Sequence, residues 1–234
     1  MEPVISCTGI SKSFQRTLVP ISFLQDRFLH PLRGAWRVQA LKDITFAVEK
    51  GEWVGLYGPN GCGKTTLLRI LAGLMQPDSG SVDVRGTISS YFDFSAGFHD
   101  ERSAVENLYF HGLFRGMSSQ EIRSIIDDII AFAGVESHQD LPVKCFSTGM
   151  KLRLGFAAAT HMKADVYLMD EVLAVGDRAF QIQCLEKLTA MKATGASALL
   201  VSHNLQHLKR VCDRVLYLEE GALTHEECVH AVAH

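Results

Sequence analysis

The chain has 234 residues, of which 47% are hydrophobic and 21% charged, and its formal net charge is −3. That length suffices for one core, alone or with one inserted subdomain, and the weak acidity argues against a broad electrostatic footprint for nucleic acid. No apolar run approaches the ~18 residues of a membrane span, and the first ten residues lack the pattern of a signal peptide. Six cysteines without paired spacing fit reduced thiols in a cytoplasm.

Short apolar runs alternate with helical patterns, so the sequence predicts an α/β fold. Gly51 and Gly80 are expected in tight turns of the early strand region. The runs expected to form strands are 4–5, 44–48, 53–57, 82–84, 88–92, 166–169, 198–201 and 215–218.

The clearest predicted helix spans 119–132. Ser118 and Glu121 form a capping box before it, isoleucines make an apolar stripe along it, and Gly134 is a suitable C-cap. This helix lies in a mainly helical stretch, about 94–161, set between two strand-rich parts. We interpret that stretch as an inserted subdomain.

Residues 58–66 read GPNGCGKTT, the GxxxxGK[ST] spacing of a phosphate-binding loop, between a predicted strand and a predicted helix. Its glycines let backbone N–H groups turn toward phosphate oxygens, Lys64 adds a positive charge, and Thr65 offers a hydroxyl to Mg²⁺. Cys62 is expected as an incidental small residue rather than a redox sensor. The residues expected to hold a nucleoside triphosphate are Gly58, Pro59, Asn60, Gly61, Cys62, Gly63, Lys64, Thr65 and Thr66.

Two carboxylates, Asp170 and Glu171, end the predicted buried strand at 166–169. Beside a phosphate loop, Asp170 is expected to hold Mg²⁺ through its water shell, and Glu171 to position or deprotonate the attacking water. Acidic residues also end many structural strands, so the pair depends on the loop for this interpretation.

Two further motifs are ambiguous when taken alone. Ser147 and Gly149, in FSTGM, precede a predicted helix and can either grip a phosphate or simply cap that helix. His203 ends another predicted strand, where a histidine is more often structural than functional.

Taken in order, these motifs resemble an ABC transporter ATPase subunit over nearly the whole chain: the phosphate loop, FSTGM with Arg153, YLMDE, the run AVGD at 174–177, and His203. The resemblance implies a P-loop NTPase cassette as a single domain, 1–234, with a RecA-like α/β core and an N-terminal antiparallel β subdomain. It places the core at 1–93 and 162–234 and the helical subdomain at 94–161.

The resemblance also implies ATP and Mg²⁺ as cofactors, with Lys64, Glu171 and His203 in catalysis and Thr65 and Asp170 at the metal. Ser147 and Gly149 are then expected to reach the ATP of a second copy in a head-to-tail homodimer. Phe14 matches the aromatic residue that stacks on adenine, the alternative being an ordinary core aromatic. An integral membrane permease subunit is the other expected partner, with no nucleic acid, which places the protein at the cytoplasmic face of the membrane.

The chain departs from the common family pattern at three places, and all three resemble the ATP-binding subunits of bacterial polysaccharide exporters. That group moves lipid-linked O-antigen, capsule or teichoic acid. The signature is FSTGM instead of LSGGQ, VLAVGD follows the carboxylate pair, and residues 15–38 form a long insertion. Asp93 is a candidate for the missing glutamine of the Q-loop. The alternatives are the ATPase of a lipid or drug exporter, a soluble ABC ATPase not tied to transport, and a regulatory nucleotide-binding module without hydrolysis.

The roles of two segments, the insertion and the C-terminal tail, have two interpretations each. The insertion mixes aromatic residues with basic ones, which suits either anionic lipid or pyrophosphate groups or a plain solvated loop. The tail from His225 to His234 carries residue types that zinc uses, but a frayed terminus is expected because its spacing matches no metal signature. The basic members of the insertion are Arg16, Arg27, His30, Arg33 and Arg37, and the aromatic ones are Phe23, Phe28 and Trp36.

Overall fold

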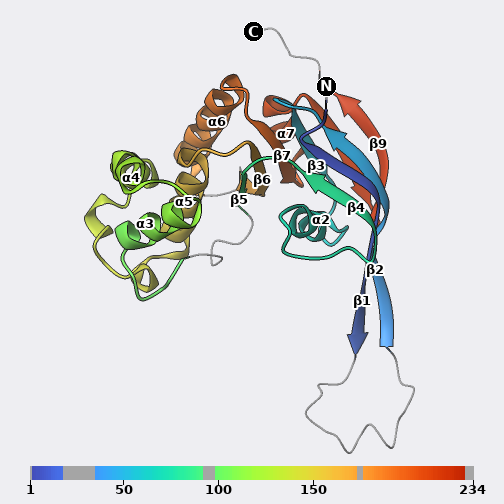
Figure 1. Cartoon of the computed structure of the whole chain (residues 1–234), viewed down its shortest axis with the longest axis horizontal. Helices are drawn as coiled ribbons and strands as arrows, with labels where there is room; N and C mark the ends of the chain where they lie inside the picture. The colour runs from blue at the N-terminus through green and yellow to red at the C-terminus, as the bar shows by residue number, and fades with distance from the viewer. Residues whose placement is uncertain (1, 18–34, 92–97, 173–175, 230–234) are drawn as a thin grey trace, which may run out of the picture.

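A computed structural model describes residues 2–17, 35–91, 98–172 and 176–229. Its centre is a six-stranded sheet in the order β5-β6-β7-β3-β8-β9, parallel except for the antiparallel β9 (Figure 1). The inner strands read as continuous apolar runs because helices and a second sheet cover both faces. The strands are β3 (Trp53–Tyr57), β5 (Ile88–Tyr91), β6 (Val166–Asp170), β7 (Ser197–Ser202), β8 (Arg214–Glu219) and β9 (Ala222–Cys228).

A second, antiparallel sheet joins β2 (Ala35–Val48), β1 (Ile5–Thr17) and β4 (Ser79–Val84), with β1 in the middle. β1 and β2 are much longer than the predicted 4–5 and 44–48, because their outer halves are polar and carry no apolar run. The ends of the predicted insertion, 15–17 and 35–38, belong to these two strands, and the rest of it lies outside the described residues.

The prediction of a turn at Gly80 is wrong, whereas Gly51 does lie in a turn. Gly80 lies inside β4, where it has a φ of +87° and faces the backbone of β1. A Cβ atom there would lie 2.4 Å from the carbonyl oxygen of Gly9, so glycine is required by the close approach of two strands.

The helices α3 (Ala104–Phe114), α4 (Ser119–Ala133) and α5 (Thr148–His161) pack around a hydrophobic cluster of their own at one end of the molecule (Figure 1). The predicted helix at 119–132 is confirmed as α4. Ser118 and Glu121 make both bonds of the capping box, and Gly134 ends the helix with a φ of +66°.

Three other helices flank the six-stranded sheet: α2 (Lys64–Leu71), α6 (Arg178–Ala193) and α7 (Leu205–Val211). Leu67 and Leu68 of α2 share a cluster with the buried faces of β1 and β2, so α2 lies between the two sheets. Phe180 and Leu208, from α6 and α7, pack with Trp53 in a separate cluster. None of the helices in the described ranges is long and apolar enough to span a bilayer.

The prediction of a frayed tail is wrong for residues 225–228, because Ala222–Cys228 forms β9, which pairs with β8. The His225 ring stacks on Tyr217 at 3.8 Å between centroids, and Glu227 accepts a 2.6 Å hydrogen bond from the Tyr217 hydroxyl. His225 and Glu227, two of the tail residues of a type that zinc uses, therefore make contacts between the strands β8 and β9. His230 and His234 lie outside the described residues.

Candidate active site

The phosphate loop follows β3, which lies between β7 and β8 in the sheet, and leads into α2. Close contacts fix two of its glycines, Gly58 and Gly63. A Cβ at Gly58 would lie 2.2 Å from the Leu218 carbonyl oxygen, and one at Gly63, where φ is +113°, would lie 2.4 Å from the Ala40 carbonyl oxygen. Neighbouring strands therefore press the loop into a shape that only glycine permits.

Lys64, the first residue of α2, is 6% exposed, and its ammonium donates to the carbonyl oxygens of Gly58 (2.7 Å) and Pro59 (2.9 Å). Within the described residues this ammonium has no carboxylate partner at ion-pair distance. Gly63 caps α2 without a side chain, so the cap itself offers no side-chain acceptor, and no other described side chain accepts from an N–H of the first turn. A buried cation and free helix N–H groups together favour an anion at this place.

Thr65 and Asp170 come together from α2 and β6, with a 2.7 Å hydrogen bond from Thr65 Oγ1 to Asp170 Oδ2. Burial raises the pKa of Asp170, while the Thr65 bond acts in the opposite direction. A hydroxyl beside a half-buried carboxylate is an oxygen pair of the kind that Mg²⁺ prefers, and a cation there would offset the cost of burying the carboxylate.

Glu171 and His203 meet next to this pair. Glu171 Oε1 accepts from the backbone N–H of His203 (2.9 Å) and lies 2.8 Å from its Nδ1, and Oε2 accepts from Ser202 Oγ at 3.3 Å. Glu171 has a φ of +52°, a strained value for a residue other than glycine. The strain and the three contacts aim this carboxylate toward the end of β7.

A hollow of about 290 Å³ joins these parts, and its wall includes Phe14, which is 37% exposed and therefore not an ordinary core aromatic. The structure thus brings together the predicted loop, Asp170, Glu171 and Phe14. The residues that line the hollow are Phe14, Ala40, Asn60, Gly61, Gly63, Lys64, Thr65, Thr66, Asp170 and Glu171.

The signature motif lies elsewhere. Ser147 caps α5, where its hydroxyl accepts from the N–H of Met150 (3.2 Å), and α5 belongs to the helical group, away from α2 (Figure 1). The space around Gly149 is open among the described residues: outside its own helix backbone and chain neighbours, an added Cβ would meet just Ser147 Oγ, at 3.9 Å. Neither residue lines the hollow as described.

Arg153 and Asp177 connect the signature helix to α6. Arg153 Nη2 donates to Asp177 Oδ2 at 2.9 Å, and Asp177 Oδ1 accepts from the N–H of Phe180 (2.9 Å) as the N-cap of α6. Ala174, Val175 and the Q-loop candidate Asp93 lie outside the described residues.

The Cys62 side chain is buried in the core cluster beneath the loop, which agrees with a packing role. Two contributors were not predicted from the sequence. Ala40 lines the hollow, and Ser202 donates to Glu171 while accepting from the N–H of Asn204 (3.1 Å). In the sequence, the one indication of a role for Ser202 is its position directly before His203.

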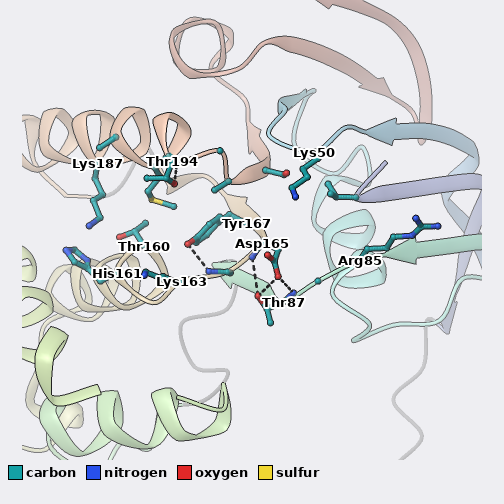
Figure 2. Close-up of a pocket in the computed structure, with 18 residues that line it drawn as sticks. Lys50, Arg85, Thr87, Thr160, His161, Lys163, Asp165, Tyr167, Lys187 and Thr194 are labelled. Carbon is teal, nitrogen blue, oxygen red and sulfur yellow. Dashed lines mark hydrogen bonds between the residues drawn. The ribbon is translucent and has the colours of Figure 1, made fainter. Parts of the chain in front are cut away.

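A larger cleft, about 940 Å³, opens at the opposite ends of the parallel strands, where the strands begin (Figure 2). Thr87, Asp165 and Ser197 line it at the N-terminal ends of β5, β6 and β7. Asp165 Oδ2 accepts from both the N–H and the hydroxyl of Thr87, at 2.7 and 2.8 Å, which joins two strand ends. The smaller hollow is the better candidate because ligands of parallel sheets bind at the carboxyl ends of the strands.

Comparison with known proteins identifies the family. The family model described as ABC transporter matches residues 41–174, more than half of the chain. The chain belongs to the ABC transporter family. It is also 36% identical over 228 residues to the O-antigen export system ATP-binding protein RfbB of Klebsiella pneumoniae, covering 95% of this chain and 93% of that protein.

Two other relatives extend the comparison. The teichoic acids export ATP-binding protein TagH of Bacillus anthracis is 36% identical over 212 residues, covering 91% of this chain and 38% of that longer protein. A solved dimeric ATP-binding cassette in a post-hydrolysis state, bound to ADP and Pi, has a TM-score of 0.80 at 21% identity, covering 97% of this chain and 99% of that chain. The fold is therefore that of an ABC ATPase cassette.

Proposed function

We propose that this ABC ATPase hydrolyses ATP to drive export of a lipid-linked or polymeric glycan through a separate membrane subunit. The observation that carries the ATPase part is the hollow in which the uncapped start of α2, the buried Lys64 ammonium and the Asp170–Glu171 pair meet. The names of the relatives in O-antigen and teichoic acid export support the glycan part.

In this proposal the loop N–H groups and Lys64 bind the β- and γ-phosphates of ATP, and Phe14 stacks on the adenine. Thr65 and Asp170 hold Mg²⁺, which when bound neutralises charge on the phosphate oxygens. The short contact between Thr65 Oγ1 and Asp170 Oδ2 supports this assignment, because it places two hard oxygen ligands side by side.

Glu171 orients or deprotonates the attacking water, and His203 contacts the γ-phosphate. The hydrogen bonds from His203 and Ser202 hold the Glu171 carboxylate before any water arrives. A fixed acceptor needs no reorganisation during phosphoryl transfer, and such pre-organisation is the main source of catalysis in this reaction class.

The position of the signature supports a site made by two chains. Ser147 and Gly149 lie on α5, outside the hollow, with open space at Gly149. We infer that they complete the site of a second copy in a head-to-tail homodimer, so that closing and reopening the dimer accompanies the ATP cycle. In this proposal residues 1–93 and 162–234 form the nucleotide-binding core, and residues 94–161 form the helical subdomain.

Mixing two inactive variants tests this arrangement. Lys64→Ala disables one half-site and Ser147→Arg the other, so each variant alone should lack ATPase activity. In a mixed dimer one site receives both lesions and the other neither. Random mixing at equal amounts should therefore restore about a quarter of the sites, measured as phosphate release. Persistent inactivity of the mixture would argue for a site contained in one chain.

The membrane partner and the location at the cytoplasmic face of the membrane follow from the proposed transport role. Expression together with a candidate permease, followed by purification through a tag on the permease, tests both. We expect this protein to co-purify and its ATPase activity to rise when the glycan substrate is present. A protein that never associates with membranes would instead fit a soluble ABC ATPase.

A further inference from the structure

Phe14 lies on a two-stranded ribbon rather than in the body of a sheet. β1 pairs with β4 only as far as Ser11, opposite Ser79. Beyond that point its one partner among the described strands is β2, through Phe14 and on to Thr17, opposite Ala35. The ribbon of β1 and β2 projects past the other labelled elements (Figure 1). Because an isolated two-stranded ribbon is marginally stable in water, the direction of Phe14 depends on how its base is anchored.

Asp78, the residue before β4, supplies that anchor. Its N–H donates to the Ser11 carbonyl oxygen (2.8 Å), and its Oδ2 accepts from the N–H of Ser13 (2.8 Å). The Asp78 carboxylate thus extends the contact between the two strands beyond Ser79, the first residue of β4. The bonded N–H belongs to the residue directly before Phe14.

Lys12 strengthens the same anchor. Its ammonium donates to Asp78 Oδ1 (2.9 Å) and to the Gln76 carbonyl oxygen (2.8 Å), and it lies 6.0 Å from the centre of the Phe14 ring. Residues two apart on a strand share a face, so one ammonium meets both the anchor and the aromatic ring. The Lys12 bond and the Ser13 N–H lower the pKa of Asp78, which keeps the carboxylate ionised at neutral pH.

We propose that Asp78, which does not line the nucleotide hollow, is a positioning residue for adenine binding because it holds the base of the ribbon that carries Phe14. This inference rests on the proposed ATP site. Fixing the ribbon before the ligand arrives removes an ordering cost from binding, so the benefit appears as nucleotide affinity and not as turnover at saturation.

Dissociation constants for Mg²⁺-ATP and for inorganic tripolyphosphate, which has no base, provide the test. Phe14→Ala should weaken ATP about tenfold, the scale of one stacked base, and Asp78→Ala about three- to tenfold. Tripolyphosphate binding should stay unchanged in both variants, and Asp78→Ala should keep the saturated rate kcat of the native protein. The double variant should bind ATP no more weakly than Phe14→Ala alone, since Asp78 acts through that ring.

Two further variants give the controls. Asp78→Asn keeps an acceptor for Ser13 and should lie between Asp78→Ala and the native protein. Asp83→Ala removes a carboxylate from β4, where among the described residues it forms an ion pair with Arg85, and should leave ATP affinity unchanged.

Each other outcome has one meaning. Equal weakening of ATP and tripolyphosphate by Asp78→Ala, or additive losses in the double variant, would overturn the positioning role. Native ATP affinity in Asp78→Ala would also overturn it when Phe14→Ala is weakened, and the proposed ATP site would stand. Native affinity in Phe14→Ala itself would reject the adenine contact, and with it the basis of the inference.

Discussion

The Glu171 carboxylate is held by both the backbone N–H and the ring of His203, at 2.9 and 2.8 Å, across the ends of two neighbouring strands. β6 and β7 are paired up to Asp170 and Val201, and the N–H of Glu171 donates to the Val201 carbonyl oxygen (2.9 Å). Pairing of two buried strands therefore sets the distance between the proposed base and the proposed phosphate contact.

Glu171→Gln should keep ATP binding and lose turnover by about 10²- to 10⁴-fold, because the amide fills the same space but accepts no proton. The ATP-bound variant should accumulate as a closed dimer, visible by size-exclusion chromatography with Mg²⁺-ATP. Normal turnover in this variant would reject Glu171 as the base.

His203→Ala should lower kcat by about 10²-fold with a small change in KM, since the proposed contact matters most as charge develops on the γ-phosphate. The backbone N–H of His203 still binds Glu171 in this variant, so the carboxylate keeps part of its support. Steady-state phosphate release over a range of ATP concentrations measures both constants. A large rise in KM with native kcat would assign His203 to ground-state binding.

The phosphate loop was predictable because its motif lies in consecutive residues, 58–66. Gly61 and Gly63 adopt positive φ values of +82° and +113°, which glycine permits, and Lys64 begins α2 directly after them. The same holds for α4, whose capping box and C-cap glycine lie next to the helix they limit.

Features that depend on distant partners were not predictable. The length of β1 follows from its pairing with β2, about thirty residues along the chain, and β9 exists because β8 offers an open edge. Gly80 suggested a turn from its own type, but its conformation follows from the backbone of Gly9. Ser202 contributes to the site only through the register between β6 and β7.

Alanine variants of two loop glycines distinguish the cost of backbone strain from the cost of a steric clash. Gly61 has a φ of +82°, and beyond its chain neighbours no described residue lies within 4 Å of an added Cβ, so Gly61→Ala should cost about 1 kcal/mol of unfolding free energy from strain alone. Gly63→Ala adds the 2.4 Å collision with Ala40 and should cost about 3 kcal/mol.

Thermal unfolding without nucleotide measures both, at about 2–4 °C per kcal/mol for a chain of this size. Equal melting temperatures for the two alanine variants would mean that the loop moves away from Ala40 at little cost.

His111, in α3, predicts a loss of stability in acid. Burial, assisted by the charge of Arg115, lowers its pKa to about 4 from 6.5. Between these values the unfolded chain binds more protons than the folded one, so stability falls as pH drops from 6.5 toward 4, by about 1–3 kcal/mol. His111→Gln should flatten the melting temperature over this range, and an unchanged slope would contradict the assignment.

Phe114, at the end of α3, is 86% exposed beside Leu113, which is 42% exposed, and this apolar pair is a suitable contact for the proposed membrane subunit. Phe114→Asp places a charge there without touching the nucleotide hollow. We expect native ATPase activity of the isolated protein but loss of co-purification with the permease. Ile182→Asp, at a half-exposed position of α6, is the matched control and should keep the association. If both variants bind the permease as the native chain does, the contact lies on another face; if Phe114→Asp also loses basal ATPase activity, the change has disturbed the helical group itself.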